Sequence, residues 1–384
     1  MPSKVKVVHI VTLLELGGAQ RNTLFTVRCL NRNRFAPVLV CGPGGMLDGE
    51  AADAGAPVRF IPSLGRAVNP LSDARAFFQL RALLKEERPD IVHTHSSKAG
   101  ILGRWAARAA GVPVILHTFH GFGFHREQKP WTRAAFVAAE KGTARISTAL
   151  IFVSRANWEE ARDRGIGRED RYRLIRSGVS LGPFRDLRRR RGPLSGLPLG
   201  SEARLITTIG PFKPQKNIRD FIRAAGAVAQ RHSDVRFLVV GDGRGRGALE
   251  REIRRRGLGE RVFLAGWRRD IPDVLARTDV FCLTSLWEGL PRALVEAMAS
   301  GLPCVANDVD GCRDVLKDGV NGFLIPPGHP LTTADRLLRL LAEEGLAGAM
   351  GDRARAAIGP EFKIEGMVAA QERLYEESLV LQSR

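Results

Sequence analysis

The sequence predicts an α/β protein built from two parallel-sheet domains. Short apolar runs rich in Val and Ile alternate with helix-length segments along the chain. Continuously apolar strands are typical of a parallel sheet buried on both faces, and strand–helix alternation is typical of α/β layers. The length of 384 residues points the same way, because one hydrophobic core seldom serves a chain longer than about 300 residues.

The expected strands form one group in each half of the chain. The first half supplies the runs at 6–14, 36–42, 57–63, 90–95, 113–121 and 149–154. The second half supplies the runs at 204–210, 235–243, 261–266, 280–285, 303–308 and 322–327. Helical patterns separate them; in 217–230, for example, Asn217 is a candidate N-cap, and one apolar face follows it at Ile218, Phe221, Ile222, Ala225 and Val228.

The alternation pauses at 177–203, a stretch rich in Gly, Pro, Ser and Arg. We therefore expect a first Rossmann-like domain at 1–180, a basic linker at 181–202 and a second Rossmann-like domain at 203–358. The run RDLRRRR within the linker is interpreted as solvated. A last helix within 359–384 is expected to pack back on the first domain. Two such domains would face each other across a cleft, with ligands at the carboxyl ends of the strands.

The formal net charge is +18. A nucleic acid, an acidic membrane surface and a phosphorylated substrate are all compatible partners, and so is a merely solvated arginine surface. The five cysteines form no CxxC pair, which favours reduced thiols over disulfides or a zinc site. No signal peptide and no bilayer-spanning apolar run is recognised, so we expect a cytoplasmic protein, with peripheral attachment to the inner membrane left open.

One segment carries unusual chemistry: residues 285–301 read SLWEGLPRALVEAMASG. Glu288 is expected in a loop after a strand, and Glu296 on the helix that follows Pro291. The amides near Gly289 and Leu290 would lie at a helix N-terminus, which suits a phosphate, while carboxylates suit sugar hydroxyls. The segment could therefore hold a nucleotide sugar; the alternative is a helix-dipole Glu and a solvated Glu.

The pattern S-x-x-E-G-x-P-x-x-x-x-E-A-M-A-x-G-x-P in this segment resembles the signature of retaining family-4 glycosyltransferases of GT-B fold. Other stretches follow in the order of that family, among them LGGAQR at 16–21, the run at 93–121, KPQKN at 213–217 and DGVNGFLIPPG at 318–328. The resemblance covers essentially the whole chain. It implies transfer of a sugar from a nucleotide donor, most simply a UDP-sugar, to a lipid-linked acceptor in bacterial surface polysaccharide synthesis.

The resemblance also assigns residues. It implies that Glu288, His120 and Lys216 are catalytic, and that Gly289, Leu290 and Glu296 bind the nucleotide sugar. Gly17 and Gly18 match the glycine loop that closes over the donor, and Trp267 matches the place where the main chain reads the base. Pro211 stands where the family usually has an Arg, and Lys213 in the same loop could replace that cation. No residue is a convincing covalent nucleophile.

No metal is expected. The DVD at 308–310 resembles the metal site of another glycosyltransferase fold but lies in a turn, and GT-B enzymes do not need that metal. The run GDGRGRG at 241–247 lacks the ending of a P-loop and is interpreted as a strand–helix connection. His93, His95 and His117 crowd neighbouring strand ends, but packing explains an HxH strand as well as a metal does.

Two further questions stay open. The basic segment 126–147, with Trp131, Phe136 and Val137, could lie on an anionic membrane or pack on the sheet. A GT-B isomerase of the UDP-N-acetylglucosamine 2-epimerase type is an alternative function. A nucleic-acid-binding protein is disfavoured, because no such motif is recognised. The donor sugar, its base, the acceptor, the linkage and the oligomeric state cannot be predicted.

Overall fold

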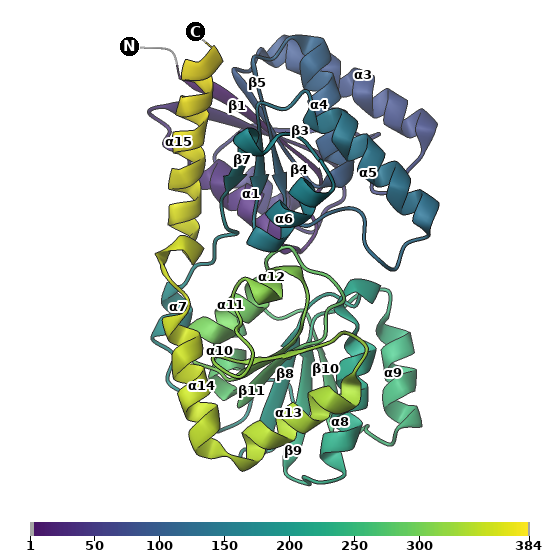
Figure 1. Ribbon diagram of the computed structural model, residues 1–384, viewed down its shortest axis with the longest axis vertical. Coiled ribbons are helices and arrows are strands. Elements are labelled where there is room, and N and C mark those ends of the chain that lie inside the picture. The colour runs from purple at the N-terminus through teal and green to yellow at the C-terminus, as the bar shows by residue number, and fades with distance from the viewer. Residues whose placement is uncertain (1–3, 383–384) are drawn as a thin grey trace. The chain divides into compact units, whose positions relative to one another are not determined.

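The apolar runs form two separate parallel sheets in the computed structural model, which describes residues 4–382 (Figure 1). The chain divides into two units: Met1–Gly178 together with Lys363–Arg384, and Val179–Phe362. Each unit is a sheet with helices on both faces, as predicted for an α/β protein. The five cysteines are free, as expected from their spacing.

The first unit holds seven strands in the order β3-β2-β1-β4-β5-β6-β7. They are β1 Val5–Leu13, β2 Phe35–Gly42, β3 Val58–Phe60, β4 Ile91–His95, β5 Val114–Phe119, β6 Ala149–Phe152 and β7 Tyr172–Leu174. Its helices are α1 Gly18–Cys29, α2 Asp48–Ala52, α3 Pro70–Glu87, α4 Ser97–Ala110, α5 Pro130–Ala144, α6 Arg155–Asp163 and α15 Ile364–Gln382, with a 3-10 turn at Glu169–Arg171.

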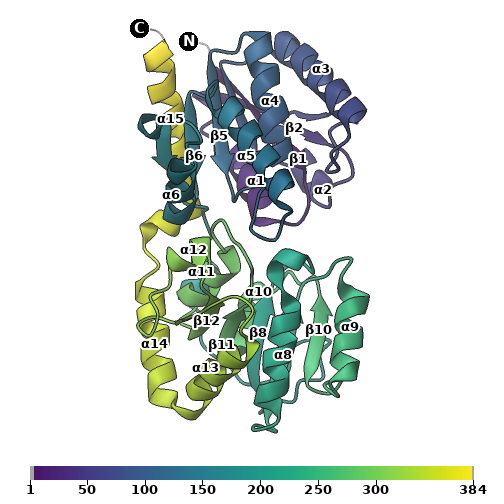
Figure 2. The same cartoon turned by 45° about the vertical axis from the view of Figure 1, so that its right-hand side comes forward.

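The two faces of this sheet have different covers. Val8, Ile10 and Val92 pack with α3 and α4, whereas Val7 and Ile91 pack with α15. Figure 2 shows α4 and α15 on opposite sides of the strands. Helix α15 also contacts α1, and the Asn31 backbone N–H donates to Glu372 Oε1 at 2.7 Å. The last helix is therefore part of the first unit's core.

The second unit holds six strands in the order β10-β9-β8-β11-β12-β13. They are β8 Arg204–Ile209, β9 Val235–Val240, β10 Val262–Gly266, β11 Val280–Leu283, β12 Cys304–Asn307 and β13 Phe323–Ile325. The helices are α7 Gly182–Arg185, α8 Ile218–Ala229, α9 Arg246–Arg255, α10 Ile271–Arg277, α11 Arg292–Ala299, α12 Asp310–Arg313, α13 Pro330–Ala342 and α14 Glu344–Ala356; 3-10 turns lie at Pro214–Lys216 and Pro360–Phe362.

The basic stretch 181–202 packs in part on the second unit, although six of the seven residues of its RDLRRRR run are exposed, as expected. Arg189 donates to the carbonyls of Thr278 and Asp279 at 3.0 and 2.7 Å. Leu194 and Leu199 are buried in a cluster with strands β8 and β9. The carbonyls at the end of α10 attract the guanidinium, since a helix C-terminus favours a cation.

In each sheet the strand order reverses once, between β1 and β4 in the first unit and between β8 and β11 in the second. Loops after two such strands leave in opposite directions, which opens a crevice at their carboxyl ends where α/β proteins bind ligands. Gly17, Lys216 and Glu288 lie in loops at these two switch points. His120 and Trp267 follow the neighbouring strands β5 and β10, and Glu296 lies on α11.

Candidate active site

The switch point of the second unit brings Lys216 and Glu288 together. Lys216 ends the 3-10 turn after β8, and Glu288 lies in the loop after β11. Lys216 Nζ forms an ion pair with Glu288 Oε1, and Ser285 Oγ donates to the same oxygen at 2.6 Å. Glu288 is only 6% exposed. A buried carboxylate requires such partners, because leaving it unpaired costs several kcal/mol.

Hydrogen bonds to the backbone hold this loop in place. Gln215 anchors it twice, since its carbonyl accepts from the Leu286 N–H at 2.8 Å and its Nε2 donates to the Trp287 carbonyl at 2.9 Å. The Asn307 amide donates to the carbonyls of Thr284 and Ser285 at 2.9 and 3.1 Å. These hydrogen bonds fix the loop that carries Glu288. Ser285 and Asn307 were not selected from the sequence for this role.

The start of α11 offers unpaired amides. Among residues 4–382, the backbone N–H groups of Gly289 and Leu290 donate to no protein acceptor. Both residues are buried. Pro291 occupies the N-cap position, one residue before the first helical turn where the sequence placed it. Unpaired amides at a helix N-terminus suit an anion, as expected for a phosphate.

Glu296 lies on α11, 3.8 Å from an Arg292 nitrogen. Their spacing of four residues puts both side chains on one face of the helix. Arg292 was not selected from the sequence, although its place at the first helical position next to the two unpaired amides is a signal for anion binding. The structure therefore adds a cation to the segment that carries the two glutamates.

Three other selected positions surround the same edge of the sheet. Lys213 caps the 3-10 turn that ends with Lys216, and Pro211 lies two residues before it. Phe212 donates its N–H to the Asp242 carbonyl at 2.9 Å, so the GDG loop lies against this turn. A Cβ at Gly241 would come within 2.0 Å of the Gly210 carbonyl oxygen, which explains that glycine. Trp267 follows β10 and is 42% exposed.

One detail of the sequence reasoning is corrected here. Asn217 sits at the N-cap of α8, but its side chain makes no capping bond and donates instead to Asp220 Oδ2 at 2.7 Å. The left-handed backbone of Asn217, with φ of 44°, turns the side chain away from the helix amides. In the DVD sequence, Arg313 donates to Asp308 Oδ1 at 2.5 Å, so that carboxylate already has a cation.

The switch point of the first unit holds histidines instead of ions. His9 on β1, His93 and His95 on β4, and His120 after β5 lie on the α15 face of the sheet. His117 lies on the other face, where its ring touches Gly100 of α4. The three histidines lie on neighbouring strands as expected, but His117 faces away from His93 and His95, because adjacent residues of a strand alternate in direction.

These rings are uncharged at neutral pH. Burial lowers the pKa of His9 to about 3 and that of His120 to about 4. Burial also lowers the pKa of His93 and His95 well below the ordinary range, and neighbouring imidazoles add to the effect. His9 was missed by sequence reasoning; the signal was a lone polar residue inside an apolar strand.

Ring nitrogens of His9, His93 and His95 lie within 4.8 Å of one another, a spacing that a metal ion could bridge. The nitrogens already have partners, however. His93 contacts the hydroxyls of Tyr375 and Thr118, each at 2.7 Å. His9 Nδ1 contacts His95 Nε2 at 3.1 Å. The donor set is thus satisfied by hydrogen bonds within the protein, apart from His9 Nε2.

The glycine loop opens α1. Gly17 is the N-cap residue with φ of −146°, an extended conformation open to any residue, and Gly18 is the first helical residue. Neither Gly17 nor Gly18 has a positive φ, so the backbone conformation does not require glycine at either position. A Cβ at Gly17 would come within 2.4 Å of Gln20 Oε1, so the neighbour that limits this position is a side chain of the same segment.

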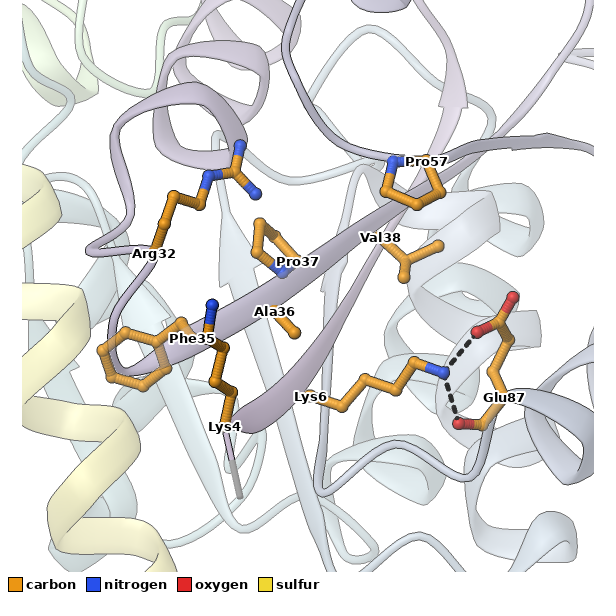
Figure 3. A pocket seen from close by; sticks show the side chains of 9 residues that line it. All are labelled: Lys4, Lys6, Arg32, Phe35, Ala36, Pro37, Val38, Pro57 and Glu87. Carbon is orange, nitrogen blue, oxygen red and sulfur yellow. Dashed lines mark hydrogen bonds and ion pairs between the residues drawn. The ribbon is translucent and has the colours of Figure 1, made fainter. Parts of the chain in front are cut away.

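A separate hollow of about 290 Å³ lies at the opposite edge of the first sheet, where strands begin (Figure 3). Lys4, Lys6 and Arg32 line it with the start of β2. Lys6 Nζ donates to the Glu87 carbonyl at 2.8 Å and pairs with its carboxylate, which lowers the pKa of Glu87. Since ligands of parallel sheets bind at the carboxyl ends of strands, we assign this hollow no part in the active site.

Helix α5 divides the basic segment 126–147 between two environments. Phe136 and Val137 pack against the apolar cluster around Phe119 and Phe152. Trp131 is 68% exposed, and Lys129 Nζ lies 5.0 Å above its ring. One face of the helix therefore belongs to the core, and the other presents an aromatic ring with cations. Within residues 4–382, no helix has the length and apolar character needed to cross a bilayer.

Two α/β units, each a parallel sheet with one switch point, form the GT-B fold. Residues 17–178 match the glycosyl transferase 4-like domain, and residues 203–343 match glycosyl transferases group 1. The chain belongs to the family-4 glycosyltransferases. The predicted family and fold are confirmed.

Individual relatives are consistent with this family and fold. The Escherichia coli UDP-Gal:alpha-D-GlcNAc-diphosphoundecaprenol alpha-1,3-galactosyltransferase is 33% identical over 383 residues, covering 98% of each chain. A Mycobacterium leprae phosphatidyl-myo-inositol mannosyltransferase is 29% identical, covering 86% of this chain and 85% of that one. Anabaena HepE in complex with UDP and glucose superposes with a TM-score of 0.83 at 21% identity, covering 97% of this chain and 100% of the other.

Proposed function

We propose that the protein is a retaining hexosyl- or N-acetylhexosaminyltransferase that moves a sugar from a UDP donor to a diphospholipid-linked saccharide in bacterial surface polysaccharide synthesis. The observation that carries this is the Lys216–Glu288 pair beside the unpaired amides of Gly289 and Leu290. The E. coli relative, named for a UDP-Gal donor and a GlcNAc-diphosphoundecaprenol acceptor, supports the choice of substrate class.

The second unit binds most of the donor in this proposal. The amides of Gly289 and Leu290 hold the diphosphate, and Glu296 holds the ribose hydroxyls through a carboxylate that accepts two hydrogen bonds. Glu288 contacts the transferred sugar, and Trp267 lies at the base. From the first unit, His120 contacts the donor sugar while Gly17 and Gly18 close over it.

Catalysis then consists mainly of stabilising the leaving diphosphate. As the bond between sugar and diphosphate breaks, negative charge grows on the diphosphate oxygens, and Lys216 neutralises it with the helix N-terminus. Lys213 supplies the second cation that Pro211 cannot. The acceptor hydroxyl attacks from the face that the diphosphate leaves, and its proton passes to the diphosphate. Configuration is therefore retained without a covalent nucleophile.

We propose that no metal is required, because the cations and amides already named suffice for the diphosphate. Transfer should survive EDTA. Loss of activity that Mg²⁺ or Mn²⁺ restores would contradict this part of the proposal.

The decisive experiment incubates the protein with UDP-Gal, UDP-Glc or UDP-GlcNAc and a GlcNAc-diphospholipid. We expect one donor to yield an α-linked disaccharide lipid together with free UDP. The same mixture without acceptor tests the isomerase alternative: conversion of UDP-GlcNAc to its 2-epimer without sugar transfer would refute the transferase assignment. Calorimetric titration with UDP, GDP and ADP identifies the base.

We further propose that the protein acts at the cytoplasmic face of the inner membrane, held by the exposed face of α5 and its flanks. Neutralising Lys129, Arg133, Lys141 and Arg145 together should weaken binding to vesicles containing phosphatidylglycerol, with about 1 kcal/mol per charge involved. A matched variant neutralises the exposed Arg251, Arg254, Arg255 and Arg256 near α9. Equal binding by the two variants would exclude α5 as the contact.

A further inference from the structure

Three histidine rings of the first unit form a continuous hydrogen-bonded chain. His9 Nδ1 lies 3.1 Å from His95 Nε2, and His95 Nδ1 lies 3.2 Å from His120 Nε2. The rings come from β1, β4 and the end of β5, which are adjacent strands. The planes of His9 and His95 differ by only 8°, so the bond between them can lie near both ring planes.

The two ends of the chain have different surroundings. His9 Nε2 and His120 Nδ1 are both buried atoms with no hydrogen-bond partner among residues 4–382. The His9 residue is completely buried, whereas His120 is partly exposed. The His120 end is therefore the one that lies next to exposed atoms, although its Nδ1 is itself buried in this structure.

Neutral rings impose one direction on the whole chain. Burial keeps the pKa of each of the three rings low, so each carries a single N–H, which it donates while its other nitrogen accepts. Either every hydrogen is on Nδ1, and the chain donates from His9 towards His120, or every hydrogen is on Nε2, and it donates the opposite way. The tautomer of His120 is thus coupled to that of His9.

The two directions differ in where one N–H is left without an acceptor. If the hydrogens are on Nε2, the N–H without an acceptor is that of His9. The His9 side chain is completely buried, so neither bulk water nor a ligand can accept this hydrogen bond. If they are on Nδ1, the N–H without a protein acceptor is that of His120. A buried donor without a partner costs its full desolvation penalty, and both nitrogens are buried in this structure. Only His120 belongs to a partly exposed residue, where a shift of the ring edge lets water or a ligand oxygen accept the N–H. The direction towards His120 is therefore favoured.

We propose that His95 and His9 are positioning residues that keep His120 in its Nδ1–H tautomer, so that His120 donates a hydrogen bond to an oxygen of the bound ligand. No proton is transferred. The identity of the oxygen, a hydroxyl of the donor sugar, rests on the proposed function; the tautomer does not. His93 supports the chain from the side, because its ring lies 4.3 Å from that of His95 and both its nitrogens are bonded elsewhere.

The direct test is long-range ¹H–¹⁵N correlation NMR of the wild-type protein with ¹⁵N-labelled histidine, recorded at pH 7.5 without substrate. A His120→Gln sample assigns the His120 signals among the 8 histidines. We expect a pyrrole-type Nδ1 and a pyridine-type Nε2 for His120. The opposite assignment overturns the proposal, whether or not sugar transfer has been observed.

Two variants of His95 separate the tautomer from packing. In His95→Asn, the side-chain amide can replace the Nδ1–H donor, whereas His95→Leu removes it. We expect His95→Leu to lower kcat/KM for the donor by about 3- to 10-fold, as for loss of one hydrogen bond, and to give His120 mixed tautomers. His95→Asn should keep the Nδ1–H signal and near-wild-type kcat/KM. Equal losses in both variants overturn the proposal.

Titration with Zn²⁺ tests the competing use of the same rings. We expect no stoichiometric binding that depends on His9. Tight binding of one equivalent that His9→Phe abolishes would show that the cluster is a metal site and would overturn the proposal. Failure of the transfer assay with an intact His120 tautomer would instead count against the proposed function alone.

Discussion

The switch points of the two units use opposite electrostatics. In the second unit a charged pair, Lys216 and Glu288, stands beside unpaired amides. In the first unit the corresponding place is filled by neutral imidazoles, whose pKa values burial holds low. The contrast teaches that one fold can place a charged pair at one switch point and uncharged, hydrogen-bonded rings at the other.

The largest expected effect is a loss of stability in the first unit, which contains a buried ion pair. Arg104 Nη2 donates to Glu140 Oε2 at 2.6 Å, and both side chains are buried between α4 and α5. Glu140→Leu leaves the guanidinium unpaired and should destabilise the first unit by about 3–5 kcal/mol. Hydrogen exchange of α4 and β5 peptides, measured against urea, reports this loss.

The matched control replaces both partners. Arg104→Leu combined with Glu140→Leu should recover most of the lost stability, because an apolar pair of similar size often substitutes for a buried ion pair. If the double variant is no more stable than Glu140→Leu, the pair is not the source of the effect.

The next effect tests the charged site itself. Lys216→Met should lower kcat by about 10²- to 10³-fold, the usual cost of removing one group that stabilises developing negative charge. Lys213→Met is the comparison, with a smaller loss expected because Lys216 is the cation that forms the ion pair with Glu288. Steady-state kinetics with the UDP-sugar measures both. A larger loss for Lys213→Met would reverse the two roles.

The two glutamates should separate binding from turnover. Glu296→Ala should weaken UDP binding by about 10- to 150-fold, since a hydrogen bond to a charged group contributes about 1.5–3 kcal/mol. Glu288→Gln should lower kcat strongly while UDP affinity stays near wild type, because its contact strengthens in the transition state. Calorimetry with UDP and initial rates test this, provided that both variants melt like the wild type. Similar losses of UDP affinity would refute the division.

The last prediction concerns the neutral side of the comparison, and its size depends on pH. The pKa of His9 is about 3 and that of His120 about 4 in the folded protein, against 6.5 ordinarily. The unfolded chain therefore binds more protons below pH 6.5, so folding stability is lost as pH falls towards 4, by up to about 1.4 kcal/mol per pH unit for each ring. Hydrogen exchange at pH 7.5, 6 and 5 should show the first unit weakening before the second, which has no buried histidine among the described residues.

Local sequence patterns predicted most of the fold because buried parallel strands are continuous apolar runs. Strand β7 was missed, since Tyr172–Leu174 is too short to show a pattern. The sequence predicted individual site residues, but it did not predict which of them contact each other. Lys216 and Glu288 are separated by 72 positions, and His9 and His95 by 86, so no local signal connects them. The packing of Arg189 on α10 was missed for the same reason.

Helix α15 has a consequence for how the protein is made. The chain leaves the first unit at Gly178 and returns at Lys363, so the second unit is inserted within the first. During synthesis from the N-terminus, residues 179–362 are complete before Ile364, Met367 and Tyr375 exist to cover the first sheet. The unit that starts first is therefore finished last, and a nascent chain stalled before residue 363 leaves that apolar sheet face open to chaperones.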